Sequence, residues 1–221
     1  RRCGYIGCLD SSMDVKSIQQ WCLKQEVVRS NKGTVREYEM FKSIVVSFMK
    51  EINELTEAPS IYYSPQFTEL VYKEDKTEMP ISKLSAGYQS LLWMVMDLAY
   101  RICMLNPELE SREQITGIVL IDEIDLHLHP KWQWNVIDAL RKTFAGVQFI
   151  IATHSPVIVQ EVPRRCVWKI RGHGKYRKFE HPEIETFGEN LGEITTEIFG
   201  YDVGSTGFHT ILKLSLIHIS E

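Results

Sequence analysis

Two adjacent carboxylates, Asp122 and Glu123, directly follow the apolar run of residues 118–121 (IVLI). Three of those four residues are β-branched, which predicts a strand buried on both faces, as in a parallel sheet. Adjacent carboxylates at the end of such a strand are unfavourable unless a cation lies near them, and open α/β sheets bind ligands at the carboxyl ends of their strands. We therefore expect Asp122 to hold Mg²⁺ and Glu123 to act beside it as a general base. The alternative is an acidic junction between a strand and a loop.

Two further stretches carry groups that suit a phosphate. Residues 84–90 (LSAGYQS) place Ser85 and Gly87 just before an expected helix, where free backbone N–H groups and the helix dipole form an anion site and glycine allows close approach. The alternative there is an ordinary serine cap. Residues 150–156 (IIATHSP) end a second apolar run near His154, whose imidazole can donate to a phosphate. Taken alone, such a histidine is more often a core residue.

Read together and in this order, the three stretches resemble the signature motif, the Walker B motif and the switch histidine of the ABC-type ATPase superfamily. The wording PISKLSAGYQSLL, GIVLIDEIDLHLHPKWQ and FIIATHSP is more similar still to one branch, the AAA-family ATPases known as predicted ATP-binding proteins involved in virulence. That branch is related to the RecF-like, SMC-like and overcoming-lysogenisation-defect ATPases. The resemblance is strong over residues 79–161. Three ordered motifs are far more specific than one short motif, which has many false positives.

The resemblance implies ATP and Mg²⁺ as cofactors and gives each candidate residue a role. Ser85 and Gly87 would bind the γ-phosphate of ATP held by the other protomer of a homodimer, which closes as an ATP sandwich. Asp122 would bind Mg²⁺, Glu123 would polarise the attacking water, and His154 would bond the γ-phosphate. The loop from Asp125 to residue 130 would cross the dimer interface.

The function implied by the resemblance is ATP binding and hydrolysis that drives dimer closure, in DNA repair or anti-phage defence, with a nuclease partner and DNA as further partners. The rival class is a non-hydrolysing, ATP-gated scaffold that binds DNA or a nuclease. A third class, a zinc-dependent nuclease built on His127 and His129, lacks an evident third ligand.

The sequence contains no GxxxxGK[ST] loop, the Walker A motif. In the resembled family that loop lies well before the signature motif. We therefore expect the chain to be the C-terminal part of a longer ATPase, and to show no ATP turnover by itself. The last eight residues, 214–221 (LSLIHISE), continue no family pattern and resemble an artefactual tail.

Composition and charge set wider bounds on the class of protein. The chain has 221 residues, 44% of them hydrophobic, and a formal net charge of -4, which fits one globular domain, alone or with an appendage. No apolar run reaches the roughly 18 residues that would span a bilayer. The five cysteines are scattered and form no CxxC pair, which favours a reduced, cytoplasmic location.

The elements that must position these residues follow from the apolar periodicity. Residues 35–55 have apolar side chains every three or four positions and predict an amphipathic helix. We expect a helical arm over residues 1–57, with a first helix at 14–29, and the C-terminal half of an ABC-type ATPase over residues 58–213. That half should contain short strands between 61 and 81, a buried helix ending near residue 105, and a strand–helix–strand unit over 118–152. The predicted fold class is therefore α/β, with a parallel sheet of the P-loop NTPase type.

The last third of the chain carries a basic stretch, residues 163–178, which holds seven Lys or Arg residues and no acidic residue. A hairpin predicted over 165–179 would turn at residues 172–174 and place Arg165, Lys169 and Arg171 on one face. Such an edge could bind DNA without sequence preference. The simpler interpretation is a solvated basic surface. A further helix is expected over residues 189–199.

Overall fold

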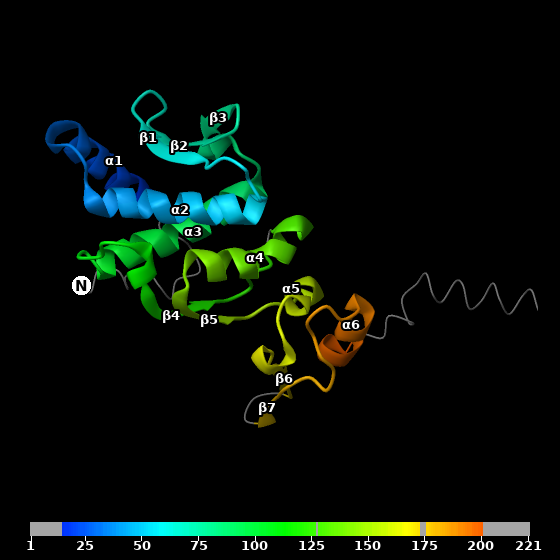
Figure 1. The fold of residues 1–221 in the computed structure, drawn as a ribbon. Coiled ribbons are helices and arrows are strands. Elements are labelled where there is room, and N and C mark those ends of the chain that lie inside the picture. The colour runs from blue at the N-terminus through cyan, green and yellow to red at the C-terminus, as the bar shows by residue number, and fades with distance from the viewer. Residues whose placement is uncertain (1–14, 127, 173–175, 201–221) are drawn as a thin grey trace, which may run out of the picture. The chain divides into compact units, whose positions relative to one another are not determined.

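The computed structural model describes residues 15–126, 128–172 and 176–200 (Figure 1). Its contacts divide the chain into two compact units, with the boundary between Ile151 and Ala152. We describe each unit by itself. Within the described ranges, no helix combines the length and the hydropathy needed to cross a membrane.

The first unit combines four α-helices with an antiparallel and a parallel pairing of strands, counted over the described residues. In chain order its elements are α1 Val15–Lys32, α2 Arg36–Asn53, β1 Ser60–Ser64, β2 Glu69–Glu74, β3 Thr77–Pro80, the 3₁₀-helix η2 Ile81–Lys83, α3 Ala86–Leu105, the 3₁₀-helix η3 Arg112–Gln114, β4 Thr116–Ile121, α4 Pro130–Thr143 and β5 Gly146–Ile151.

Helix α2 is the central element of this unit, because it contacts α3, α4 and β1 (Figure 1). Its apolar side chains recur every three or four residues and are fully buried. They include Phe41, Ile44, Phe48 and Ile52. The helix ends where Glu54 adopts a left-handed backbone (φ 55°), with its N–H bonded to carbonyls of the last turn. The amphipathic helix predicted over residues 35–55 is therefore confirmed.

Strands β1, β2 and β3 form an antiparallel meander, with Tyr62 opposite Val71 and Tyr72 opposite Met79. The side chains of Leu70 and Val71 are fully buried. Strand β3 leads through η2 directly to Ser85, the first residue before α3. The meander therefore directly precedes the stretch in which the sequence predicts an anion site.

Strands β4 and β5 are parallel neighbours, with α4 between them in the chain, and Ile121 lies opposite Ile151. The predicted parallel strand–helix–strand unit is confirmed. The prediction that the β4 strand is buried on both faces is wrong: Ile118 is 63% exposed, Leu120 74% and Ile150 53%. The described part of the chain supplies only these two parallel strands and leaves that apolar face uncovered.

The second unit contains α5 Pro156–Gln160, the 3₁₀-helix η4 Arg164–Cys166, β6 Lys169–Arg171, β7 Lys178–Glu180 and α6 Leu191–Phe199. Its core joins Val159, Val167 and Ile194. Strands β6 and β7 are antiparallel, with Ile170 opposite Phe179. The predicted hairpin is confirmed with shorter strands.

Other predicted elements are also confirmed, with shifted ends, at α1, α3, α4 and α6. The division of the chain at residue 57 stays a prediction. The tail at residues 214–221 and residues 173–174 of the hairpin turn predicted at 172–174 lie outside the described residues.

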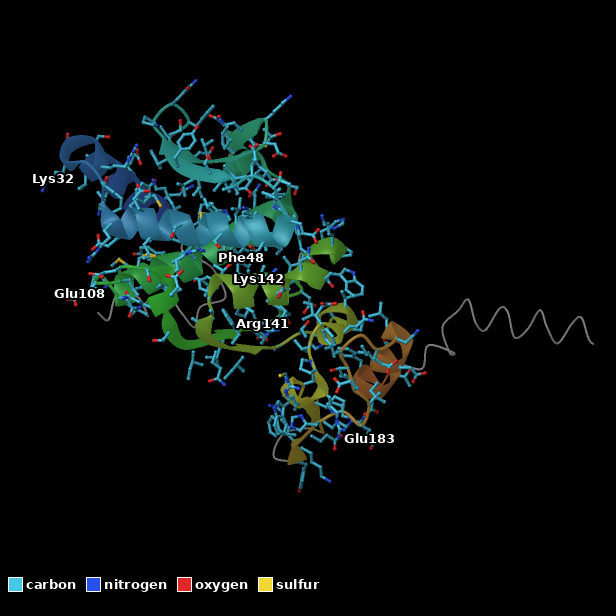
Figure 2. All side chains as sticks on the ribbon, in the orientation of Figure 1. Lys32, Phe48, Glu108, Arg141, Lys142 and Glu183 are labelled. Atoms are coloured by element: carbon cyan, nitrogen blue, oxygen red, sulfur yellow. The ribbon has the colours of Figure 1, made fainter. Side chains whose placement is uncertain are left out.

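The packing of α2 predicts a large effect of truncating Phe48, which Figure 2 marks on that helix. Phe48→Ala removes a fully buried ring from the contact with the neighbouring elements and should lower the free energy of unfolding by about 3–5 kcal/mol. Urea denaturation of the chain measures this change. Val27→Ala is the matched control, because Val27 is 52% exposed on α1, and it should change the free energy by less than about 0.5 kcal/mol. Equal effects of the two changes would contradict the assigned core.

Candidate functional site

The two predicted carboxylates lie in the turn that follows β4. Asp122 and Glu123 are exposed, whereas Ile124 and Leu128 on the same loop are buried, at 4% and 8% exposure. The loop is closed by a hydrogen bond from the Leu126 N–H to the Glu123 carbonyl, 2.9 Å. Two apolar anchors thus hold a short loop whose carboxylates face solvent at the carboxyl end of a parallel strand.

Glu123 has a left-handed backbone, with φ at 50°. Residues with a Cβ atom avoid this region, at a cost of roughly 1–2 kcal/mol, and strain of this kind is concentrated at functional sites. The φ angle of the neighbouring Asp122 is not positive. Glu54, Thr68 and Asp75 share this backbone among the described residues, and Glu123 is the one of the four that the sequence assigns as the base.

Asp122 fits Mg²⁺ as one ligand among several. Mg²⁺ in nucleotide sites is usually held by one or two carboxylates, together with substrate phosphates and water. Asp122 offers an exposed oxygen donor at the edge of the sheet where ligands of α/β folds bind. The described residues contain no cluster of three or more His, Cys, Asp or Glu side chains suited to a metal.

His129 has a capping role at the start of α4. Its Nδ1 atom accepts a hydrogen bond from the Lys131 N–H at 3.2 Å, and Pro130 occupies the first turn of the helix. His127 lies outside the described residues.

Ser85 is the N-cap of α3, and its Oγ accepts a weak hydrogen bond from the Tyr88 N–H at 3.4 Å. The side chain of Gln89 reaches back and donates to the carbonyls of Leu84, at 2.8 Å, and Ser82, at 3.2 Å. Gly87 lies in the first turn of the helix. The segment before α3 is therefore fixed by its own helix, while Ser85 stays exposed at a positive helix end.

His154 is exposed and belongs to the second unit, in the segment between β5 and α5. The next residue, Ser155, caps α5, because its Oγ accepts from the Ile158 N–H at 3.4 Å. The Ser155 N–H in turn donates to the Thr153 hydroxyl at 3.0 Å. These bonds shape the segment that carries His154, and its role as a switch histidine stays a prediction.

The sequence alone did not single out the link between the two predicted loops. The ring of Tyr88, in the first turn of α3, meets the ring of Trp132, in the first turn of α4, edge to face, with centroids 5.1 Å apart. Both side chains also bond to Asn53 at the end of α2. The structure therefore brings the start of α3 next to the start of α4, the helix that follows the Asp122–Glu123 loop. Tyr88 and Trp132 both lie within the sequence stretches that resemble the family motifs. Their place in those stretches is the feature of the sequence that could have pointed to this contact.

The predicted cationic edge of the hairpin is wrong. Lys169 is only 5% exposed, and its Nζ lies 2.6 Å from the Glu197 carboxylate and 3.7 Å from that of Glu180. Arg171 pairs with Glu180 at 3.3 Å. The bonded Glu183 N–H, followed by the Lys169 ammonium, holds the pKa of the Glu197 carboxyl below its usual range. The neutralising acids come from β7 and α6, beyond the basic stretch that the sequence pattern covered.

Comparison with known protein families shows the family of this chain. The model of a family described as AAA ATPase domain matches residues 15–159, which is well over half of the chain. The chain belongs to this AAA ATPase domain family. The matched range contains every residue to which the sequence assigns a role in catalysis or in binding nucleotide or metal: Ser85, Gly87, Asp122, Glu123, Asp125 and His154.

Two relatives of this AAA ATPase domain are named as probable ATPases of retrons. The chain is 37% identical over 160 residues to the Retron Vc95 probable ATPase of Vibrio cholerae serotype O1 biovar El Tor, covering 72% of the chain and 30% of that protein. It is 39% identical over 109 residues to the Retron Ec83 probable ATPase of Escherichia coli, covering 49% of the chain and 20% of that protein. The chain thus spans less than a third of the length of these relatives.

Among solved structures, the domain is similar to the SMC head domain from Thermotoga maritima, with a TM-score of 0.48 and 16% sequence identity. The similarity covers 72% of this chain and 52% of the other.

The left-handed backbone of Glu123 in this AAA ATPase domain predicts an unusual stability order. Glu123→Gly relieves the strain, whereas Glu123→Ala keeps it, so the glycine variant should be more stable than the alanine variant by roughly 1 kcal/mol. Thermal and urea denaturation of the chain measure the difference. At Asp122, whose φ is not positive, the same pair of changes should give the reverse order, because glycine adds only chain entropy to the unfolded state. A glycine variant at Glu123 that is less stable than alanine would contradict the backbone assignment.

Proposed function

We propose that the whole protein that carries this chain binds and hydrolyses ATP, with Glu123 as the general base. The observation that carries the proposal is the pair Asp122–Glu123 in an exposed, strained turn at the end of a parallel strand, within a domain of an ATPase family.

The proposed roles follow the chemistry of phosphoryl transfer, which depends mainly on positioning and electrostatic stabilisation. Asp122 holds Mg²⁺, which when bound neutralises charge on the phosphate oxygens. Glu123 accepts a proton from the attacking water. His154 donates a hydrogen bond to the γ-phosphate. Each role extends a side chain whose local surroundings are described above.

We propose further that hydrolysis takes place in a homodimer. Ser85 and Gly87 stand at the exposed, positive end of α3, which suits a phosphate that comes from outside the protomer. Asp125 lies in the loop after Glu123, in position to contribute to the same dimer interface. The ATP then lies between two copies, and its hydrolysis separates them.

The test of the base is Glu123→Gln in the whole protein, which keeps the size of the side chain and removes its ability to accept the proton. Steady-state turnover should fall by at least about 100-fold, while ATP still binds. Light scattering should then detect a dimer that persists with ATP and Mg²⁺. Turnover at the parental rate would exclude Glu123 as the base. Absence of ATP turnover by the parent itself would favour the rival function, an ATP-gated scaffold.

The wider role that we propose is anti-phage defence or DNA repair, with a nuclease partner that acts on DNA. Two retron ATPases by name among the relatives support this direction. The partner should be retained on the persistent ATP dimer. Purification of the tagged Glu123→Gln protein from its own host, with ATP, should recover a chain that cleaves DNA, and the same purification of Asp122→Ala should recover less. Equal absence of nuclease activity from both would contradict the partner proposal.

A further inference from the structure

Asn53, the last residue of α2, is the centre of a polar cluster that joins four elements of the first unit. Its amide bonds to Tyr88 on α3, to Trp132 on α4 and to Glu74 at the end of β2. We call Asn53, Tyr72, Glu74, Tyr88 and Trp132 the Asn53 network. All five side chains belong to the same unit, so their mutual distances are described directly.

The donors and acceptors of this network allow one arrangement. The indole N–H of Trp132 can only donate, and it reaches the Asn53 Oδ1 at 2.8 Å. The Asn53 Nδ2 must then face the other way, where it donates to the Tyr88 hydroxyl at 2.7 Å and to the Glu74 Oε2 at 3.2 Å. Both ends of the amide are in use. A rotated amide would set its NH₂ group against the indole N–H.

Glu74 completes the network as an acceptor. Its Oε2 receives the hydroxyl hydrogens of Tyr72 and Tyr88, each at 2.6 Å, in addition to the Asn53 amide. An ionised carboxylate is purely an acceptor and suits three donors. Burial, followed by the bond to Glu74, raises the pKa of both tyrosines, so the hydroxyls stay protonated and keep donating.

The position of the network distinguishes it from ordinary packing. Tyr88 belongs to the residue 84–90 stretch that carries Ser85 and Gly87, and Trp132 follows directly after the loop that carries Asp122, Glu123 and Asp125. Their rings are also in edge-to-face contact. A single amide therefore fixes the first turns of the two helices next to both predicted ATP-binding loops. This network is partly buried, and its bonds favour one geometry, because breaking one of them leaves a partly buried polar group without its partner.

We propose that Asn53 and Glu74 are positioning residues that hold the Ser85 loop and the Asp122–Glu123 loop in one fixed arrangement, so that in the closed dimer one loop meets the partner's ATP while the other meets the protomer's own ATP. This inference rests on the proposed function, because it concerns the loops assigned there. It adds that α2 and β2, which carry none of the motifs, set the spacing between them. Neither Asn53 nor Glu74 touches nucleotide in this account.

The experiment uses conservative changes in the whole protein. Trp132→Phe and Tyr88→Phe each delete a hydrogen-bonding group and retain a ring. Each should lower kcat for ATP by about 10-fold, the effect of one lost hydrogen bond on the arrangement, while KM for ATP changes by less than about 2-fold. Because both act through Asn53, the double variant should be much less impaired than the product of the single effects.

Two controls separate positioning from stability. Trp134→Phe, on the same helix but 40% exposed, should leave kcat unchanged. Phe48→Leu, in the neighbouring core, should lower the melting temperature without lowering kcat at a temperature where the protein is folded. If the network variants lower the melting temperature but keep the parental kcat wherever the protein is folded, as expected for Phe48→Leu, the proposal is overturned.

A readout in the Glu123→Gln background separates this proposal from the proposed function. Glu123→Gln alone should form the persistent ATP dimer, and adding Trp132→Phe or Tyr88→Phe should weaken it by about 10-fold. If the parent hydrolyses ATP and Glu123→Gln traps the dimer, but the network variants dimerise and turn over as the parent does, this proposal fails and the proposed function stands. If Glu123→Gln traps nothing, the proposed function fails first.

Discussion

The structure of the first unit depends on the burial of the apolar face of α2. This helix contacts α3, α4 and β1, and its buried side chains at three- and four-residue spacing hold those elements around one core. Its last residue, Asn53, fixes the positions of α3 and α4 relative to α2, because the amide can bond to Tyr88 and Trp132 only when the three helices are packed together. Hydrophobic burial stabilises the unit, and the hydrogen bonds of the Asn53 amide set how the three helices are placed relative to one another.

Buried anchors and helix caps also hold the two loops that carry the predicted functional side chains. The apolar anchors Ile124 and Leu128 hold the loop after β4, so Asp122 and Glu123 can face solvent without loosening it. The N-cap of Ser85 and the side chain of Gln89 do the same for the start of α3. Exposed chemistry on rigid supports is what phosphoryl transfer requires, since it depends on positioning more than on covalent chemistry.

Local pattern predicted the elements well, and it failed where distant residues decide. Helix α2, the β4–α4–β5 unit and the cap at Ser85 follow from periodicity and capping chemistry within short windows. The exposure of Ile118 and Leu120 could not be predicted, because an apolar strand reports a preference for burial and not the presence of a covering layer. Lys169 was misassigned for the same reason: its partner Glu197 lies 28 residues further along the chain.

We propose that Glu123 faces the reacting phosphate in a dimer whose second copy contributes Ser85. A structure of the whole Glu123→Gln protein with ATP and Mg²⁺ tests it most directly. We expect two protomers with ATP between them. The side chain at position 123 should lie within hydrogen-bonding distance of a water beside the γ-phosphate, and Ser85 of the opposite copy should lie at that same phosphate. A nucleotide bound away from position 123, or contacted by one protomer alone, would exclude this arrangement.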